Sequence, residues 1–160
     1  MTRVGAVLVA VIAIITAACS TSDQSAAADH RAVVETLAGG EVDLDELTSE
    51  DVLLWFWSPS CQHCRNAIPE LADIHYEFGD EVQFVGVVAP HDRCAAKEMV
   101  EAEGLDGFDH VVDPGYELAD AFAVMALPTY VAIGSGGCVH RSVGAPATAE
   151  LGDTLDDLRG

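Results

Sequence analysis

A run of apolar residues that ends in two closely spaced cysteines limits what this chain of 160 residues can fold into. Residues 52–57 are all apolar, and the short segment Ser58-Pro59-Ser60 separates them from the motif Cys61-Gln62-His63-Cys64. A short continuous apolar run bounded by turn residues is typical of a strand that is buried on both faces. The sequence therefore predicts that Cys61 lies where a buried strand gives way to a helix.

The first turn of a helix is a favourable place for the thiolate of Cys61. Unpaired backbone N–H groups and the positive end of the helix dipole stabilise a negative charge there. A thiolate is the nucleophile of thiol–disulfide exchange, and the second thiol, Cys64, is placed to resolve the mixed disulfide that forms. The motif thus indicates a thiol–disulfide oxidoreductase with Cys61 and Cys64 as its catalytic residues.

The first 18 residues have the pattern of an export signal. Arg3 precedes the apolar residues 4–15, which are too few for a membrane span of about 20 residues. Small residues lead up to Cys19 and resemble a bacterial lipobox, whose cysteine is lipid-modified and becomes the new N-terminus. We expect residues 1–18 to be a signal peptide and Cys19 to be the lipid attachment site. A plain secretory signal cut near Ala18 is the alternative, and both readings export the protein to the extracytoplasmic side.

Polar and small residues at 19–32 predict a flexible tether to a single domain at 33–160. Asp and Glu number 27 against 7 Lys and Arg, which gives a formal net charge of −20. A surface with this excess of negative charge repels nucleic acid and anionic lipid headgroups. We therefore expect neither of them as a direct ligand. The membrane is expected as a partner only through the N-terminal lipid.

Strand and helix signals alternate along the domain. A βαβ unit is followed by a β-hairpin and a helix, which predicts an α/β fold with a central mixed sheet flanked by helices. Pro69 is expected to kink the first long helix, and Ala149, Leu151, Leu155 and Leu158 to face inward in the last. The predicted elements are a short hairpin at 33–37 and 41–44, strands at 52–57, 82–89, 109–112, 129–133 and 139–143, and helices at 61–78, 93–103, 116–122 and 148–158.

In these residues the domain resembles the extracytoplasmic thioredoxin-like proteins of the TlpA/ResA/DsbE type. The likeness covers most of residues 33–158. Four stretches carry it: residues 41–47, residues 54–64 together with Ile68-Pro69-Glu70-Leu71, residues 111–114, and residues 122–129.

The resemblance implies a thioredoxin fold and a role for individual residues. Cys61 corresponds to the exposed nucleophile and Cys64 to the buried resolving thiol. Pro128 matches a cis-proline that faces the cysteine pair, so that Leu127 offers backbone hydrogen bonds to a substrate peptide. Trp57 resembles a residue that packs beside the active site and contacts the substrate, and a role in the core alone is the alternative.

Two positions near the motif differ from this family. Thioredoxins carry a buried acid where this chain has Trp55, and some reductive members carry Glu where it has Ala67. His63 resembles the histidine of strongly oxidising members, although Gln62 replaces their proline. An imidazole near Cys61 would stabilise the thiolate, and a stabilised reduced form makes the disulfide a stronger oxidant. We therefore favour an oxidase, with Gln62 and His63 as tuning residues; the alternative for His63 is a loop residue without this role.

The expected partners are exported proteins or peptides that carry thiols or disulfides, and a membrane redox partner that resets the pair. We expect no dissociable cofactor and no metal. By family likeness, a reductase that serves the assembly of c-type cytochromes is an alternative. In a different class, a Sco-like copper chaperone would bind metal through Cys61, His63 and Cys64 with His91 or Cys94, but Sco proteins use a Cys-x-x-x-Cys motif and a distal histidine.

Cys94 and Cys138 form an even pair, which in an oxidising compartment suggests a structural disulfide. The predicted strand order opposes this pairing. It places the two residues at opposite ends of the sheet, about 15 Å or more apart along strands that rise ~3.3 Å per residue. A disulfide needs Cα atoms within about 7 Å, so we expect no bridge between them.

Overall fold

The computed structural model describes residues 33–89, 92–144 and 148–159. The predicted signal peptide, the predicted lipid attachment site Cys19 and the tether at 19–32 lie outside the described residues. Within the described ranges, no helix has both the length and the apolar composition needed to cross a bilayer.

A mixed five-stranded sheet forms the centre of the domain, in the order β5-β4-β3-β6-β7. The central strand β3 pairs in parallel with β4 and antiparallel with β6. Of the strands predicted from the sequence, four are confirmed to the residue and the fifth, predicted at 82–89, is one residue shorter at each end. The strands are β3 (Val52–Trp57), β4 (Gln83–Val88), β5 (Asp109–Val112), β6 (Thr129–Ile133) and β7 (Val139–Val143).

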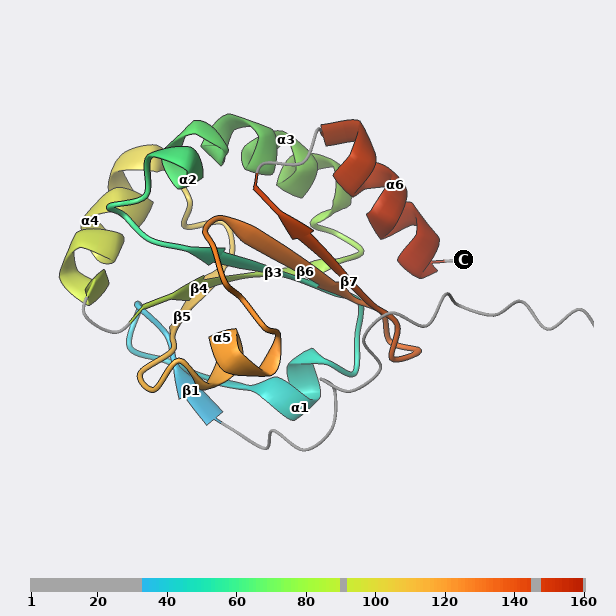
Figure 1. The fold of residues 1–160 in the computed structure, drawn as a ribbon, viewed down its shortest axis with the longest axis horizontal. Coiled ribbons are helices and arrows are strands. Elements are labelled where there is room, and N and C mark those ends of the chain that lie inside the picture. Colours follow the sequence, from blue (N-terminus) through green and yellow to red (C-terminus); the bar gives the residue numbers. More distant parts are fainter. Residues whose placement is uncertain (1–32, 90–91, 145–147, 160) are drawn as a thin grey trace, which may run out of the picture.

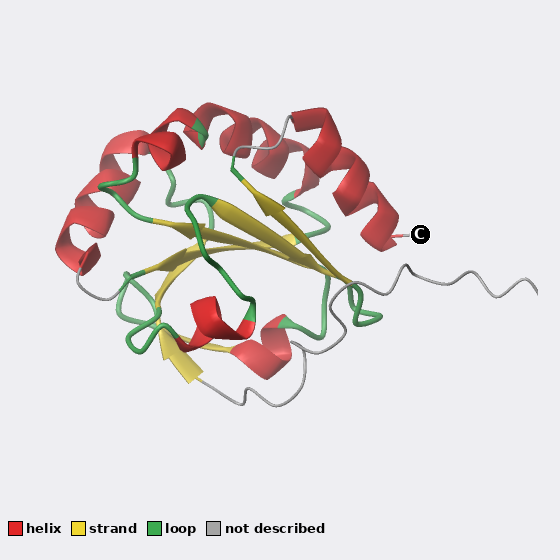
Figure 2. Ribbon diagram, in the orientation of Figure 1, coloured by secondary structure: helices red, strands yellow, loops and turns green. Residues whose placement is uncertain are grey.

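Helices cover both faces of this sheet (Figures 1 and 2). One face carries α2 (Gln62–Asn66), α3 (Ile68–Phe78), α4 (Arg93–Glu103) and α6 (Thr148–Arg159). The other face carries α1 (Leu44–Leu47), α5 (Glu117–Ala121) and the predicted N-terminal hairpin, formed by β1 (Val33–Glu35) and β2 (Glu41–Asp43). The predicted thioredoxin-like architecture, a mixed sheet between two layers with an N-terminal hairpin, is confirmed.

Alternation along β3 builds a separate core on each face of the sheet. Odd-numbered side chains pack under α2, α3, α4 and α6, and even-numbered side chains pack against α1 and α5. The six side chains of β3 are each at most 2% exposed, as predicted for a strand buried on both faces. Because both faces are packed, the end of β3 is fixed, and the loop that follows it starts from a rigid support. The two sets are Leu53, Trp55 and Trp57, and Val52, Leu54 and Phe56.

Two details of the predicted helices are wrong. The helix predicted over 61–78 divides at Ala67, and Pro69 lies in the first turn of α3 rather than inside a kinked helix. Proline is favoured there because the first N–H groups of a helix have no acceptor within it. In α6, Leu151 and Leu155 are buried as predicted, but Ala149 is exposed. At 3.6 residues per turn, positions two apart lie about 200° apart around the helix, so Ala149 and Leu151 face opposite sides.

Candidate active site at the Cys61–Cys64 motif

The Cys-x-x-Cys motif lies at the junction of β3 and α2, where the sequence predicts it. Cys61 is the N-cap residue of α2, with an extended backbone. Its own N–H group donates to the Ser58 carbonyl at 3.0 Å, and its sulfur accepts a hydrogen bond from the Cys64 N–H group at 3.1 Å. A backbone donor therefore points at the Cys61 sulfur, an arrangement that favours a thiolate once the pair is reduced.

The two cysteines differ in their access to solvent. Cys61 is half-buried, whereas Cys64 is fully buried in the core on the face covered by α2, α3, α4 and α6. They form a disulfide with Cα atoms 5.2 Å apart, within the usual range for such bonds. An external thiol can thus approach Cys61 but not Cys64, which is the asymmetry that the predicted roles of nucleophile and resolving thiol require.

The segment before β6 contains the second part of the predicted site. The peptide bond between Leu127 and Pro128 is cis, as the resemblance implies. Thr129 pairs with Phe56, so Pro128 lies at the same end of the sheet as the loop that leads to Cys61. Pro128 is buried, while Leu127 is 37% exposed. Leu127 therefore lies at the same end of the sheet as the motif and is partly exposed, and its contact with a substrate stays a prediction.

An apolar groove of about 200 Å³ lies beside this segment. Its walls come from the ends of β3 and β4, from the region of α5 and from residues 124–127. Met125 and Tyr116, which both line it, are exposed large apolar side chains. The sequence reading did not identify this groove, and the only local signal for it is the apolar composition of residues 122–127, which a core segment shares.

The predicted tuning residues are both on the surface of α2. Gln62 and His63 are exposed, and the Gln62 amide donates to the Asn66 side-chain oxygen at 2.9 Å. The influence of His63 on Cys61 stays a prediction. Arg65, which the sequence reading did not single out, donates from its guanidinium to the carbonyl of Pro59 and so ties α2 to the loop before the motif.

Below the motif lies a layer of aromatic side chains. The rings of Trp55 and Trp57 stack with centroids 4.9 Å apart, and His110 from β5 meets both of them edge-on. The Nε2 atom of His110 lies 2.8 Å from the Leu105 carbonyl, which can only accept, so Nε2 carries the hydrogen. Burial lowers the pKa of His110 below its ordinary value of 6.5, against the opposing effect of that hydrogen bond.

Three residues that the resemblance singles out, Trp55, Trp57 and Ala67, are buried. Trp57 is 1% exposed, so its packing agrees with the core alternative, although it also forms part of the groove wall; contact with a substrate stays a prediction. Trp55 is 1% exposed and Ala67 is fully buried. Both positions at which the resemblance would have allowed an acid are therefore apolar and enclosed.

Cys94 and Cys138 lie at opposite ends of the sheet, as predicted. Cys94 follows the end of β4 in α4 and is exposed. Cys138 precedes Val139, which pairs with Ile133 opposite the start of β3. Among the described residues there is no group of three or more His, Cys, Asp or Glu side chains that could hold a metal ion. His91, which the copper alternative offers as a ligand beside Cys94, lies outside these residues.

The mixed sheet, the Cys-x-x-Cys at the start of α2 and the neighbouring cis-proline together define a thioredoxin-fold protein with a dithiol–disulfide site. Comparison of the sequence with known families agrees with this class of protein. The chain belongs to the AhpC/TSA family, whose model matches residues 24–142.

Two relatives and one solved structure are similar to this chain. The chain is 30% identical over 106 residues to the thiol-disulfide oxidoreductase ResA of Halalkalibacterium halodurans, a match that covers 66% of this chain and 60% of the relative. It is 27% identical over 152 residues to the soluble secreted antigen MPT53 of Mycobacterium tuberculosis, covering 92% of this chain and 87% of the relative. Among solved structures, that of MTB dsbF superposes with a TM-score of 0.74 at 26% identity and covers 80% of this chain and 95% of the other.

Proposed function

We propose that this protein is an extracytoplasmic thiol–disulfide oxidoreductase that exchanges disulfides with exported proteins through Cys61 and Cys64. The observation that carries the proposal is the pairing of an accessible sulfur at a helix N-cap with a fully buried one. The name of the ResA relative supports the reaction class. The secreted MPT53 relative and the predicted signal peptide support export, with a lipid on Cys19 as the proposed anchor.

In the oxidising direction, a client thiolate attacks the Cys61 sulfur of the disulfide. The bond between Cys61 and Cys64 breaks, its electron pair goes to the Cys64 sulfur, and that sulfur takes up a proton. A second client thiolate then attacks the client sulfur of the mixed disulfide and releases Cys61 as a thiolate, which the backbone donor of α2 stabilises. The client gains a disulfide, the protein holds two thiols, and a membrane redox partner removes the two electrons.

We favour this direction over reduction because the backbone donor at the Cys61 sulfur favours the reduced form, and His63 on α2 is predicted to do the same. The reductase alternative runs the same steps backwards, with Cys64 freeing Cys61 from the client. In either direction, the apolar groove beside Leu127 suits an extended client segment with an apolar side chain near its cysteine.

The deciding experiment is the reduction potential of the Cys61–Cys64 pair, measured by equilibrating the full chain with glutathione. A value between about −120 and −180 mV, the range of strong oxidants and isomerases, would support the oxidase. A value at or below about −270 mV, the range of thioredoxin, would support the reductase. A Cys61→Ala variant that kept full exchange activity with a protein client would refute the function in both directions.

A further inference from the structure

A chain of hydrogen bonds links the loop before Cys61 to the start of α4. The hydroxyl of Ser58 lies 2.7 Å from Asp92 Oδ2 and 2.8 Å from the hydroxyl of Ser60, whose N–H group also donates to Ser58 Oγ at 3.2 Å. An ionised carboxylate can only accept, so Ser58 gives its one hydrogen to Asp92 and accepts from Ser60. The order Ser60 to Ser58 to Asp92 is therefore fixed, and it ends on a negative charge.

The local structure of α4 does not explain where the Asp92 side chain points. Asp92 is the N-cap residue of α4, and an aspartate there ordinarily accepts a hydrogen bond from an N–H group of the first turn. Asp92 makes no such capping bond. Its carboxylate instead reaches Ser58, which is 34 positions earlier in the chain and only 6% exposed.

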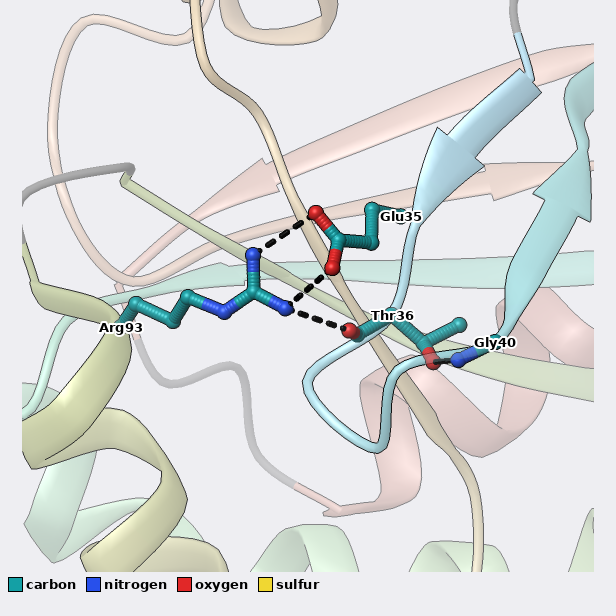
Figure 3. Close-up of polar contacts among 4 residues, drawn as sticks. All are labelled: Glu35, Thr36, Gly40 and Arg93. Atoms are coloured by element: carbon teal, nitrogen blue, oxygen red, sulfur yellow. Dashed lines mark hydrogen bonds and ion pairs between the residues drawn. The ribbon is translucent and has the colours of Figure 1, made fainter.

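The residue after Asp92 is held from the other side. Arg93 binds both carboxylate oxygens of Glu35, at 2.8 and 2.5 Å, and reaches the Thr36 carbonyl at 3.3 Å (Figure 3). The hydrogen bond from Arg93 lowers the pKa of Glu35. Thr36 in turn accepts from the Gly40 N–H group within the hairpin (Figure 3). The start of α4 is thus fastened to the N-terminal hairpin, and Asp92 connects this fixed point to the active-site loop.

The same loop sets the position of Cys61. Its N–H group donates to the carbonyl of Ser58, so Asp92, Ser58 and Cys61 are successive members of one hydrogen-bonded network. Figure 1 shows α2 and α4 at the same end of the sheet. On α2, Arg65 binds the Pro59 carbonyl, and His63 is exposed. Asp92 thus brings a negative charge to this network, whereas the backbone donor at the Cys61 sulfur favours the thiolate.

We propose that Asp92 is a positioning residue of the Cys-x-x-Cys site. Through Ser58 it fixes the loop that presents Cys61, and its charge disfavours the Cys61 thiolate, which lowers the reduction potential of the pair. A negative charge near a thiol raises its pKa, and a less stable reduced form makes the disulfide a weaker oxidant. This inference rests on the proposed function and opposes the oxidising effect assigned to His63.

The test is the equilibrium of the full chain with glutathione, in which one protein disulfide and two glutathione thiols give two protein thiols and one glutathione disulfide. Two electrons and two protons move to the protein, and the mass after alkylation reports the fraction reduced. Asp92→Asn keeps an acceptor for Ser58 but removes the charge. We expect it to shift the equilibrium toward the dithiol by about three- to tenfold, where tenfold corresponds to about 30 mV. The pKa of Cys61, followed by its alkylation rate against pH, should fall by about half a unit to one unit.

Two further variants separate charge from structure. Ser58→Ala keeps the charge but removes the link, and we expect a smaller shift in the same direction. Asp80→Asn removes an exposed charge in the turn between α3 and β4, at the far end of the sheet, and should leave the equilibrium within about twofold of the wild type.

Three results would overturn the role of Asp92: an unchanged potential in Asp92→Asn, a shift toward the disulfide in either Asp92→Asn or Ser58→Ala, or an equal shift in Asp80→Asn. A wild-type pair that does not react with glutathione at all would instead refute the proposed function, and with it this inference.

Discussion

Gly86 in β4 provides a direct test of the aromatic layer under the active site. A Cβ atom at this position would lie 2.1 Å from Nδ1 of His110 and 2.9 Å from Nε1 of Trp57. In Gly86→Ala the imidazole must therefore move by on the order of 1 Å within a close-packed core. Overpacking costs about 1–3 kcal/mol and occasionally more, and we expect about 3 kcal/mol because both neighbours are buried rings.

The assay is urea denaturation of the oxidised protein, followed by far-UV circular dichroism. The midpoint should fall at an unchanged slope, and the melting temperature should drop by about 10 °C for a domain of this size. A double-mutant cycle identifies the cause: in the His110→Ala background, Gly86→Ala should cost at least about 2 kcal/mol less. If the two losses add to within about 0.5 kcal/mol, contact with His110 is not the cause and the reasoning is refuted.

Cys61→Ala should abolish exchange, whereas Cys64→Ala should accumulate mixed disulfides with clients; mass spectrometry of trapped adducts tests both, and adducts on Cys64 instead of Cys61 would contradict the assigned roles. Burial lowers the pKa of His110, so below pH 6.5 the unfolded chain binds more protons than the folded protein. The free energy of unfolding should therefore decrease as the pH falls below 6.5, by at most about 1.4 kcal/mol per pH unit. His110→Gln should remove this part of the slope in denaturation curves, and an unchanged slope would assign it to other groups. Met125 is 92% exposed, so Met125→Ser should leave the melting temperature unchanged but slow exchange with an unfolded protein client by about threefold. Equal slowing with glutathione would argue against a client contact.

Elements whose signals are local could be predicted from the sequence. The run 52–57 is uniformly apolar because both of its faces are buried, and that composition by itself marks a central strand. The helix at 93–103 ends at Gly104, which adopts the left-handed conformation that glycine favours, so the stop signal and the structure agree. The motif could be placed for the same reason, since Cys61 directly follows a strand and a short turn.

Features that depend on contacts between distant residues could not be predicted in this way. Asp92 immediately before a helix reads as a helix cap, and nothing local indicates that its carboxylate faces Ser58. Gly86 reads as a weak point in a strand, whereas in the fold it leaves room for the imidazole of His110. The two residues of each pair meet only when neighbouring strands or loops come together. The sequence pattern around either residue therefore does not indicate the contact.

The position of Asp92 also separates two effects that an acid can have on a dithiol site. An acid beside the buried thiol accepts its proton and accelerates the step in which that thiol attacks, but Trp55 and Ala67 occupy the places where the resemblance would put one. Asp92 is instead linked to the loop of the accessible sulfur, Cys61, through Ser58. In the role proposed for it, its charge acts on the Cys61 thiolate, whose stability sets the reduction potential. It follows that Asp92→Asn should change the equilibrium with glutathione more than the rate at which Cys64 resolves a mixed disulfide.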